Sequence, residues 1–159
     1  MIHAILEAIR IAELEGLTQS HDESILTGFF EKKLVGALQR LARLWENTPD
    51  SCYLEIGVFQ SMTLLSVAAT NSKLSCYGID NFAYSDREGK NFGMLLDRRE
   101  KLHGTNAHAI NLDYENGLEN LSTHIDGRRV AVFFVDGPHD YRSQLMCRIS
   151  RFPICMIKA

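Results

Sequence analysis

The chain has 159 residues, a length typical of one domain, and a formal net charge of −3. Hydrophobic residues make up 45% of the chain and charged residues 23%, which is ordinary usage for a globular protein and disfavours disorder. The sequence contains no run of basic residues, so nucleic acid is disfavoured as the main partner, because phosphate binding needs a concentrated positive face.

The first 49 residues are predicted to be helical. Apolar residues recur at helical spacing near the start, at Ile2, Ile5, Leu6 and Ile9. A clearer helix follows the polar stretch 18–23, and its apolar stripe consists of Phe30, Leu34, Leu38, Leu41 and Trp45. This helix is expected to end at 47–50, because Pro49 and the residue before it resist helical geometry. We therefore predict an N-terminal helical segment, 1–49, before a second domain, 50–159.

After Pro49, short apolar runs alternate with helical runs. Strands are predicted at 52–56, 74–79, 107–112 and 130–135. Helices are predicted at 62–69, at 91–102, near 115–121 and from about 141 to 149, with a polar loop at 81–90. This alternation predicts an α/β fold with a parallel sheet and crossover helices. The run 130–135 is apolar at every position, which predicts a strand buried on both faces at the sheet centre.

Polar residues follow the first two predicted strands, and ligands of open parallel sheets bind beyond the carboxyl ends of the strands. Gly57 would let the backbone approach a ligand closely, although turn chemistry alone explains a glycine there equally well. Asp80 lies in the low twenties of residues beyond Gly57, the spacing at which a carboxylate holds the hydroxyls of a ribose. The alternative role for Asp80 is to cap the next segment.

The third and fourth predicted strands are also followed by acids. Asp113 would accept a hydrogen bond from the amine of a base or cap the next helix, and both alternatives stay open. Asp136 directly follows the most apolar strand, where an acid is costly unless it is paired or used. His139 and Tyr141 lie nearby, so we interpret this segment as functional.

These segments resemble the motifs of class I, Rossmann-like, S-adenosylmethionine-dependent methyltransferases. Residues 54–63 are similar to the first motif, ExGxxxGx(S/T), 78–80 to the second-strand motif, and 111–113 to the third. Residues 134–141, FVDGPHDY, resemble the (I/V)DGxHxY signature of the branch with small-molecule O-methyltransferases. The resemblance spans about 52–144 and implies a Rossmann-like parallel sheet with strand order 3-2-1-4 and flanking helices, with a short fifth strand at 154–157 as an option.

The family resemblance implies an enzyme that transfers a methyl group from S-adenosyl-L-methionine to a small-molecule acceptor, with a hydroxyl as the expected acceptor group. Asp80, with Asn81 beside it, would hold the ribose, and Asp113 would lie near the adenine. The turn after the first strand would shape the pocket for the methionine part, through Glu55, Gly57, Phe59, Gln60 and Ser61.

The same resemblance implies catalytic roles for Asp136 and His139. Asp136 would lie below the reactive methyl group, and His139 would act as a general base or orient the acceptor. In metal-dependent relatives the acid that matches Asp136 binds a divalent cation, so Mg²⁺ is a candidate cofactor. The aromatic residues Phe82, Tyr84 and Phe92 would line the acceptor side, although core packing explains Phe92 equally well.

The sequence departs from the family pattern in two places. Ser61 stands where the first motif has its second glycine, so a hydroxyl and a Cβ are expected to face the cofactor space. From about Cys147 onward the acidic metal-ligand pair and the closing hairpin of the family are missing, so we expect a C-terminally truncated domain with an incomplete metal site. The strand 130–135 would then lie at or near an exposed edge, which predicts self-association.

Three other functions stay open. The first is a non-catalytic fragment that binds the cofactor without transfer. The second, a nicotinamide-dependent oxidoreductase, is disfavoured because GxGxxG is absent after the first strand. The third, a metal-dependent hydrolase that uses Asp136, His139 and Asp140, lacks further ligands at helical spacing.

The sequence also bears on the compartment. The four cysteines form no CxxC pair, so we expect buried free thiols in a reducing compartment. Residues 1–17 lack the basic region, apolar stretch and cleavage site of a signal peptide, and no apolar run is long enough to span a bilayer. We therefore expect a cytoplasmic protein with no membrane partner.

Overall fold

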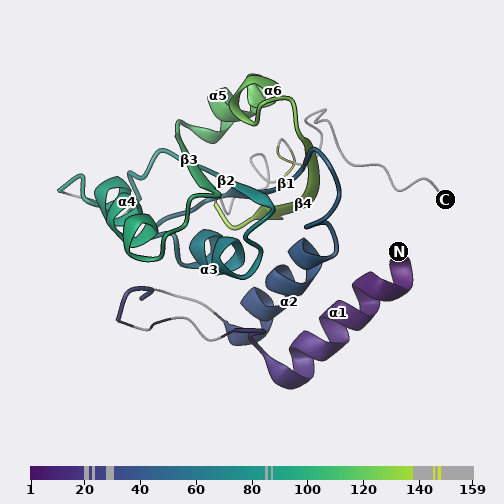
Figure 1. Cartoon of the computed structure of the whole chain (residues 1–159). Coiled ribbons are helices and arrows are strands. Elements are labelled where there is room, and N and C mark those ends of the chain that lie inside the picture. The colour runs from purple at the N-terminus through teal and green to yellow at the C-terminus, as the bar shows by residue number, and fades with distance from the viewer. Residues whose placement is uncertain are drawn as a thin grey trace.

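The computed structural model describes residues 1–19, 22, 24–27, 31–84, 86, 88–137, 145 and 147. These residues form a four-stranded, all-parallel sheet flanked by helices (Figure 1). The strands are β1 (Ser51–Ile56), β2 (Ser75–Asp80), β3 (Ala107–Asn111) and β4 (Arg129–Val135), in the order β3-β2-β1-β4. The predicted α/β class, the parallel sheet and the strand order 3-2-1-4 are confirmed. The optional strand 154–157 lies outside the described residues.

The inner strands of the described sheet are β2 and β1, and all six residues of β1 are buried. The neighbours of β1 are β2 on one side, where Glu55 pairs with Gly78, and β4 on the other, where Glu55 pairs with Phe134. The prediction that 130–135 forms the sheet centre is wrong for the described sheet: β4 is an outer strand, and of its seven residues Val130 alone is buried. An all-apolar run is compatible both with a central strand and with an outer strand that is partly covered. The composition of 130–135 therefore does not distinguish a central from an outer position. Self-association through β4 stays a prediction.

Six helices are described: α1 (Ile2–Glu15), α2 (Lys32–Arg43), α3 (Met62–Thr70), α4 (Asn91–Lys101), α5 (Tyr114–Glu119) and α6 (Leu121–His124). Helices α2 and α3 share one core cluster with Tyr53, while α6 contributes to a second cluster around Leu54. Successive residues of a strand point to opposite faces, so β1 supplies both cores. Of the predicted helix 141–149, Leu145 and Cys147 are described, and both are helical. No helix in the described ranges is both long enough and apolar enough to cross a membrane.

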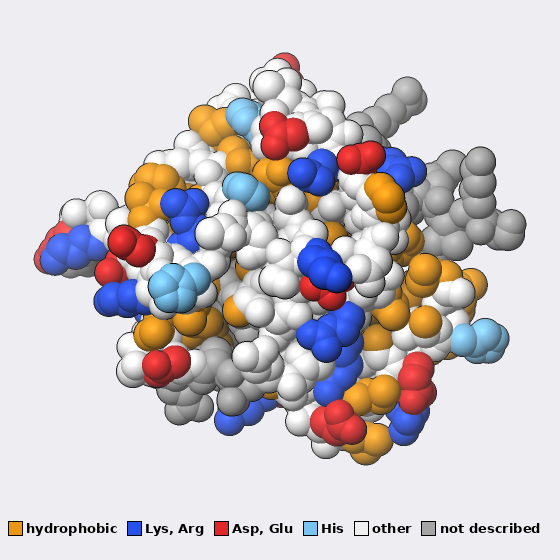
Figure 2. All heavy atoms as spheres, viewed as in Figure 1, with side chains coloured by type: hydrophobic (Ala, Val, Ile, Leu, Met, Phe, Trp, Pro, Cys, Tyr) orange, Lys and Arg blue, Asp and Glu red, His pale blue; other side chains and the backbone are white. Residues whose placement is uncertain are grey.

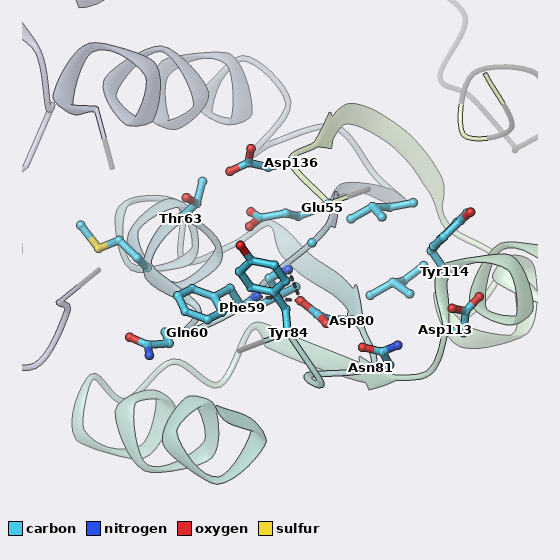
Figure 3. A pocket seen from close by; sticks show the side chains of 16 residues that line it. Glu55, Phe59, Gln60, Thr63, Asp80, Asn81, Tyr84, Asp113, Tyr114 and Asp136 are labelled. Carbon is cyan, nitrogen blue, oxygen red and sulfur yellow. Dashed lines mark hydrogen bonds between the residues drawn. The ribbon is translucent and has the colours of Figure 1, made fainter. Parts of the chain in front are cut away.

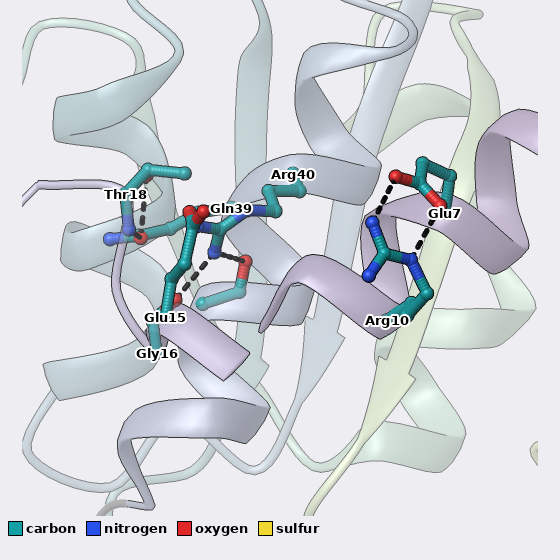
Figure 4. A network of polar contacts seen from close by, with 8 residues as sticks. Glu7, Arg10, Glu15, Gly16, Thr18, Gln39 and Arg40 are labelled. Carbon is teal, nitrogen blue, oxygen red and sulfur yellow. Dashed lines mark hydrogen bonds and ion pairs between the residues drawn. The ribbon is translucent and has the colours of Figure 1, made fainter. Parts of the chain in front are cut away.

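The buried face of α2 differs from the predicted stripe. Leu34 is 45% exposed, whereas Gln39, which the pattern placed off the stripe, is 1% exposed. The Gln39 side chain is satisfied at both ends: its Oε1 accepts from Thr18 N at 2.9 Å (Figure 4), and its Nε2 donates to Ser66 Oγ at 3.0 Å. These hydrogen bonds offset the desolvation of the amide, so the helix can turn a polar residue toward α3.

Helix α1 packs against α2 through small residues, and Ala8 and Ala12 are its buried positions. Arg40 of α2 fixes the end of α1, since its guanidinium donates to Gly16 O at 2.5 Å and pairs with Glu15 at 2.9 Å (Figure 4). The apolar residues that predicted the helix are largely exposed: Ile2 is 69%, Leu6 59% and Ile9 42% accessible. Figure 2 shows hydrophobic side chains gathered over this helix.

Candidate functional site

A cavity of about 600 Å³ lies at the carboxyl ends of the four strands, around the turn that joins β1 to α3 (Figure 3). Its wall combines backbone of this turn with acidic and aromatic side chains. The lining residues are Glu55, Ile56, Gly57, Val58, Phe59, Gln60, Met62, Thr63, Ile79, Asp80, Asn81, Tyr84, Asp113, Tyr114, Asp136 and Gly137. The structure thus brings eight of the ten residues that the sequence singled out to one cavity; Ser61 does not line it, and His139 lies outside the described residues.

The turn after β1 is built from residues in the left-handed backbone region. Gly57 has φ 86°, and Phe59 and Ser61 adopt φ 49° and φ 67°. A side chain at Gly57 would place its Cβ 2.3 Å from Gly137 Cα, so glycine is required here by the approach of the segment after β4. Non-glycine residues in this region carry strain of about 1–2 kcal/mol each, so Phe59 and Ser61 are held in place by their surroundings.

Ser61 does not face the cavity. Its side chain is fully buried, and its Oγ donates to Gln60 O at 2.5 Å. Its backbone N–H donates to Val58 O at 2.8 Å, which closes the turn. The expectation that the Ser61 hydroxyl and Cβ face the cofactor space is therefore wrong, because the left-handed backbone turns the side chain into the protein.

Asp80 anchors this turn from the end of β2. Its Oδ2 accepts from the N–H groups of Val58 at 2.8 Å and Phe59 at 2.7 Å, and its Oδ1 accepts from Phe82 N at 2.7 Å (Figure 3). A carboxylate has about four acceptor positions, two on each oxygen, so Oδ2 is filled by its two N–H donors and Oδ1 retains capacity for one ligand hydroxyl. Asp80 consequently has a structural role that is similar to the predicted capping role, because it binds backbone N–H groups, and it also lines the cavity.

Glu55 is the most deeply buried acid of the cavity wall, at 2% exposure on the inner strand β1. Its Oε2 accepts a hydrogen bond from the Tyr53 hydroxyl at 2.7 Å. Burial raises the pKa of Glu55 to about 8, the hydrogen bond from Tyr53 lowers it, and the carboxylates of Asp136 and Asp80 raise it further. Glu55 therefore holds its proton near neutral pH unless a positive charge lies beside it.

The remaining acids of the wall are exposed. Asp113 is the N-cap of α5, where its Oδ1 accepts from Glu115 N at 2.9 Å, so its predicted capping alternative is confirmed and it also lines the cavity. Asn81 accepts from Ala83 N at 3.0 Å through its side chain. Asp136 is held through its backbone, since its N–H donates to Ile56 O at 2.8 Å.

Of the aromatic residues proposed for the acceptor side, Tyr84 alone lines the cavity. It is 76% exposed, and its ring meets Phe59 edge to face at 5.8 Å. Phe82 is 4% exposed and packs against Phe92 at 5.1 Å, so both belong to the core side of the loop. Tyr114 and Thr63 also line the cavity without having been predicted as site residues, although Thr63 is the last position of the first motif and Tyr114 directly follows the third.

Arg98 of α4 stabilises the turn after β1 through hydrogen bonds, and it was also not predicted as a site residue. It is 6% exposed, its guanidinium donates to Gln60 O, and its Nη2 donates to Thr27 Oγ1 at 2.6 Å. Burial lowers the pKa of Arg98, opposed by the nearby Asp97. No sequence signal distinguishes Arg98 from its basic neighbours in α4, since its partners lie 38 and 71 positions away in the sequence.

The described residues do not assemble a metal site: no group of three or more His, Cys, Asp or Glu side chains among them is placed to hold an ion. His139 and Asp140, which the sequence placed beside Asp136, lie outside the described residues.

Acids lie at or just beyond the carboxyl ends of all four strands and aromatic rings stand among them, so the cavity favours a ligand that carries positive charge. A scan against protein-family models, a search of curated proteins and a search of solved structures each found no match to this chain.

Proposed function

We propose that the protein is a methyltransferase that binds S-adenosyl-L-methionine in the strand-end cavity and methylates a hydroxyl of a small-molecule acceptor. The observation that carries the proposal is the single cavity shared by the turn after β1 and the acids Glu55, Asp80, Asp113 and Asp136. These residues come from the four segments that resemble methyltransferase motifs. The cavity volume of about 600 Å³ lies in the range of small-molecule sites.

The charge of the site suits this donor. A sulfonium is a cation, so carboxylates and the faces of aromatic rings favour it over a neutral ligand. We assign Glu55, Gly57 and Gln60 to the methionine part, Asp80 and Asn81 to the ribose, and Asp113 with Tyr114 to the adenine. Phe59 and Tyr84 would flank the reaction centre, where Asp136 would lie.

The proposed chemistry is an in-line displacement. The methyl carbon leaves the sulfonium sulfur, which keeps the electron pair and becomes a neutral thioether, and the carbon bonds to the acceptor oxygen. The hydroxyl proton passes to a general base, for which Asp136 and His139 are the candidates. The main tasks of the protein are alignment of the two reactants and removal of this proton.

The first test is isothermal titration of the purified chain with S-adenosylmethionine. Asp136→Asn is the informative variant, since the side chain is exposed and of equal size, and we expect binding to weaken about tenfold, or roughly 1.4 kcal/mol. Asp97→Asn, an exposed acid of α4 outside the cavity wall, is the matched control and should bind as the wild type does. Asp80→Ala is less suitable, because it removes the acceptor of three backbone N–H groups.

Absence of saturable binding by the folded wild-type chain would contradict the proposal. Binding without methyl transfer to any of a panel of hydroxyl acceptors would favour the alternative of a non-catalytic, cofactor-binding protein. We also propose a reducing compartment such as the cytoplasm, because Cys52, Cys76 and Cys147 are buried free thiols.

A further inference from the structure

Glu55 occupies an unusual position for an acid. It lies on the inner strand β1, is 2% exposed, and belongs to the wall of the cavity together with Asp80 and Asp136. Figure 3 shows its side chain among these carboxylates. A buried carboxylate is strongly disfavoured without a cation or several hydrogen bonds.

Among the described residues, the groups around Glu55 provide no cation. Tyr53 on the same strand donates the hydrogen bond described above, and no hydrogen bond or ion pair joins Glu55 to a basic side chain in the described ranges. The elements packed against it carry acids or neutral groups: β2 contributes Asp80 and the buried thiol of Cys76, and Asp136 follows β4. On the α3 side, the cavity wall is formed by uncharged Met62 and Thr63.

We infer that Glu55 makes the cavity selective for a ligand that carries a cationic group: Glu55 holds a proton while the cavity is empty and releases it when a positive charge binds beside it. The inference rests on the proposed function for the identity of the ligand, since S-adenosylmethionine offers two such charges, a sulfonium and an ammonium. It goes beyond that function because it makes proton release part of binding. Tyr53 is a positioning residue that orients the carboxyl group.

This coupling has a measurable consequence. When binding releases one proton, affinity rises as pH rises, by up to about tenfold per pH unit, until the empty site has itself lost the proton. Burial raises the pKa of Glu55 to about 8, so the rise should extend to about that pH. A ligand of the same shape without positive charge gains nothing, because it does not favour the ionised carboxylate.

The test measures the number of protons released. Titration calorimetry at about pH 7 in phosphate and in Tris gives this number, because the heat differs between buffers by the ionisation enthalpy of the released proton. Three probes separate the charges: S-adenosylmethionine has both, S-adenosylhomocysteine has the ammonium alone, and 5′-methylthioadenosine has neither. We expect about one proton for the first. Proton release with S-adenosylhomocysteine as well would identify the ammonium as the charge beside Glu55. Proton release with S-adenosylmethionine alone would identify the sulfonium.

Glu55→Gln is the control, since it keeps the shape and removes the titration. It should reduce proton release to zero and remove the gain in affinity between about pH 6 and 8. Tyr53→Phe serves as a second variant: loss of its hydrogen bond raises the pKa of Glu55, so the affinity should level off at a higher pH than in the wild type. Equal proton release by the wild type and Glu55→Gln would overturn the inference, as would equal release with 5′-methylthioadenosine.

A measurement without ligand makes the inference independent of the binding assay. The carboxyl carbon of Glu55, followed by NMR and assigned by its absence in Glu55→Gln, should titrate near pH 8 in the empty protein, and titration near 4.5 would overturn the inference. Binding of adenosyl ligands without proton release would reject the inference and leave the proposed function intact. Failure of all three probes to bind, with titration near 8, would reject the proposed function and the ligand inferred with it.

Discussion

Gly57 and Gly137 meet backbone to backbone: a Cβ on Gly57 would lie 2.3 Å from Gly137 Cα and 2.4 Å from its nitrogen. The contact joins the turn after β1 to the segment after β4, and both line the cavity. The first and fourth motif segments, 54–63 and the part of 134–141 that is described, are thus held together by a contact that only glycine permits at position 57. The ligand is therefore not the sole reason for a glycine at this position.

Replacing Gly57 by alanine should destabilise the protein. The added Cβ would overlap backbone atoms that cannot move aside, and the residue would keep φ 86°, so we expect a loss of about 2–4 kcal/mol. Urea unfolding followed by circular dichroism measures the change. Gly127→Ala is the control, since Gly127 has φ 68° with open space around its Cβ position and should lose only about 1–2 kcal/mol. Equal losses in the two variants would show that the contact with Gly137 has no energetic importance.

Glu55 should make the stability of the ligand-free protein fall as pH rises. Its folded-state pKa of about 8 lies above the ordinary value of 4.5, so between these values the folded state keeps a proton that the unfolded state has lost. The free energy of unfolding should therefore decrease by up to about 1.4 kcal/mol per pH unit in this window and level off above it. Urea unfolding between about pH 5 and 9 tests this, with Glu55→Gln expected to show a flatter curve. A wild-type curve that matches the variant would mean that Glu55 ionises normally.

Removal of the Arg98 guanidinium should weaken the support of the turn. Arg98→Met keeps the length of the side chain but leaves Gln60 O and Thr27 Oγ1 without their donor, so we expect a loss of about 1–3 kcal/mol. Arg99→Met is the matched control, because Arg99 makes one long contact, 3.4 Å to Ala107 O, and is half-buried. Thermal unfolding of both variants gives the comparison. A larger loss in Arg99→Met would contradict the assigned role of Arg98.

Ser61→Gly should leave ligand affinity within about twofold of the wild type, because Ser61 is buried behind the cavity wall. Its effect on stability should also be small: glycine relieves about 1–2 kcal/mol of backbone strain but makes the unfolded chain more flexible and loses the Oγ hydrogen bond. Titration calorimetry with S-adenosylmethionine and urea unfolding measure the two quantities. A marked gain in affinity would restore the earlier expectation that the serine faces the ligand.

The sequence by itself determined the four strands and the parallel sheet, whereas the strand order followed from the family resemblance and the central place expected for 130–135 was wrong. Each strand was predicted to within a residue at either end: 52–56 against Ser51–Ile56, for example, and 130–135 against Arg129–Val135. Apolar periodicity is a local property, so it can be recognised without knowledge of the fold. The gathering of Glu55, Asp80, Asp113 and Asp136 at one edge also followed from the sequence, because the carboxyl ends of parallel strands share an edge.

Only the tertiary structure decided what each of these side chains contacts. The burial of Gln39, the inward turn of Ser61 and the support given by Arg98 all depend on neighbours brought together by folding. Likewise, Asp80 binds the turn that begins more than twenty residues earlier, and Gly57 meets a glycine of another strand end. The periodicity of apolar residues indicates which face of a helix or strand is apolar, but not how the element is rotated about its axis when it packs against a neighbour. That rotation is set by packing and by hydrogen bonds between distant segments.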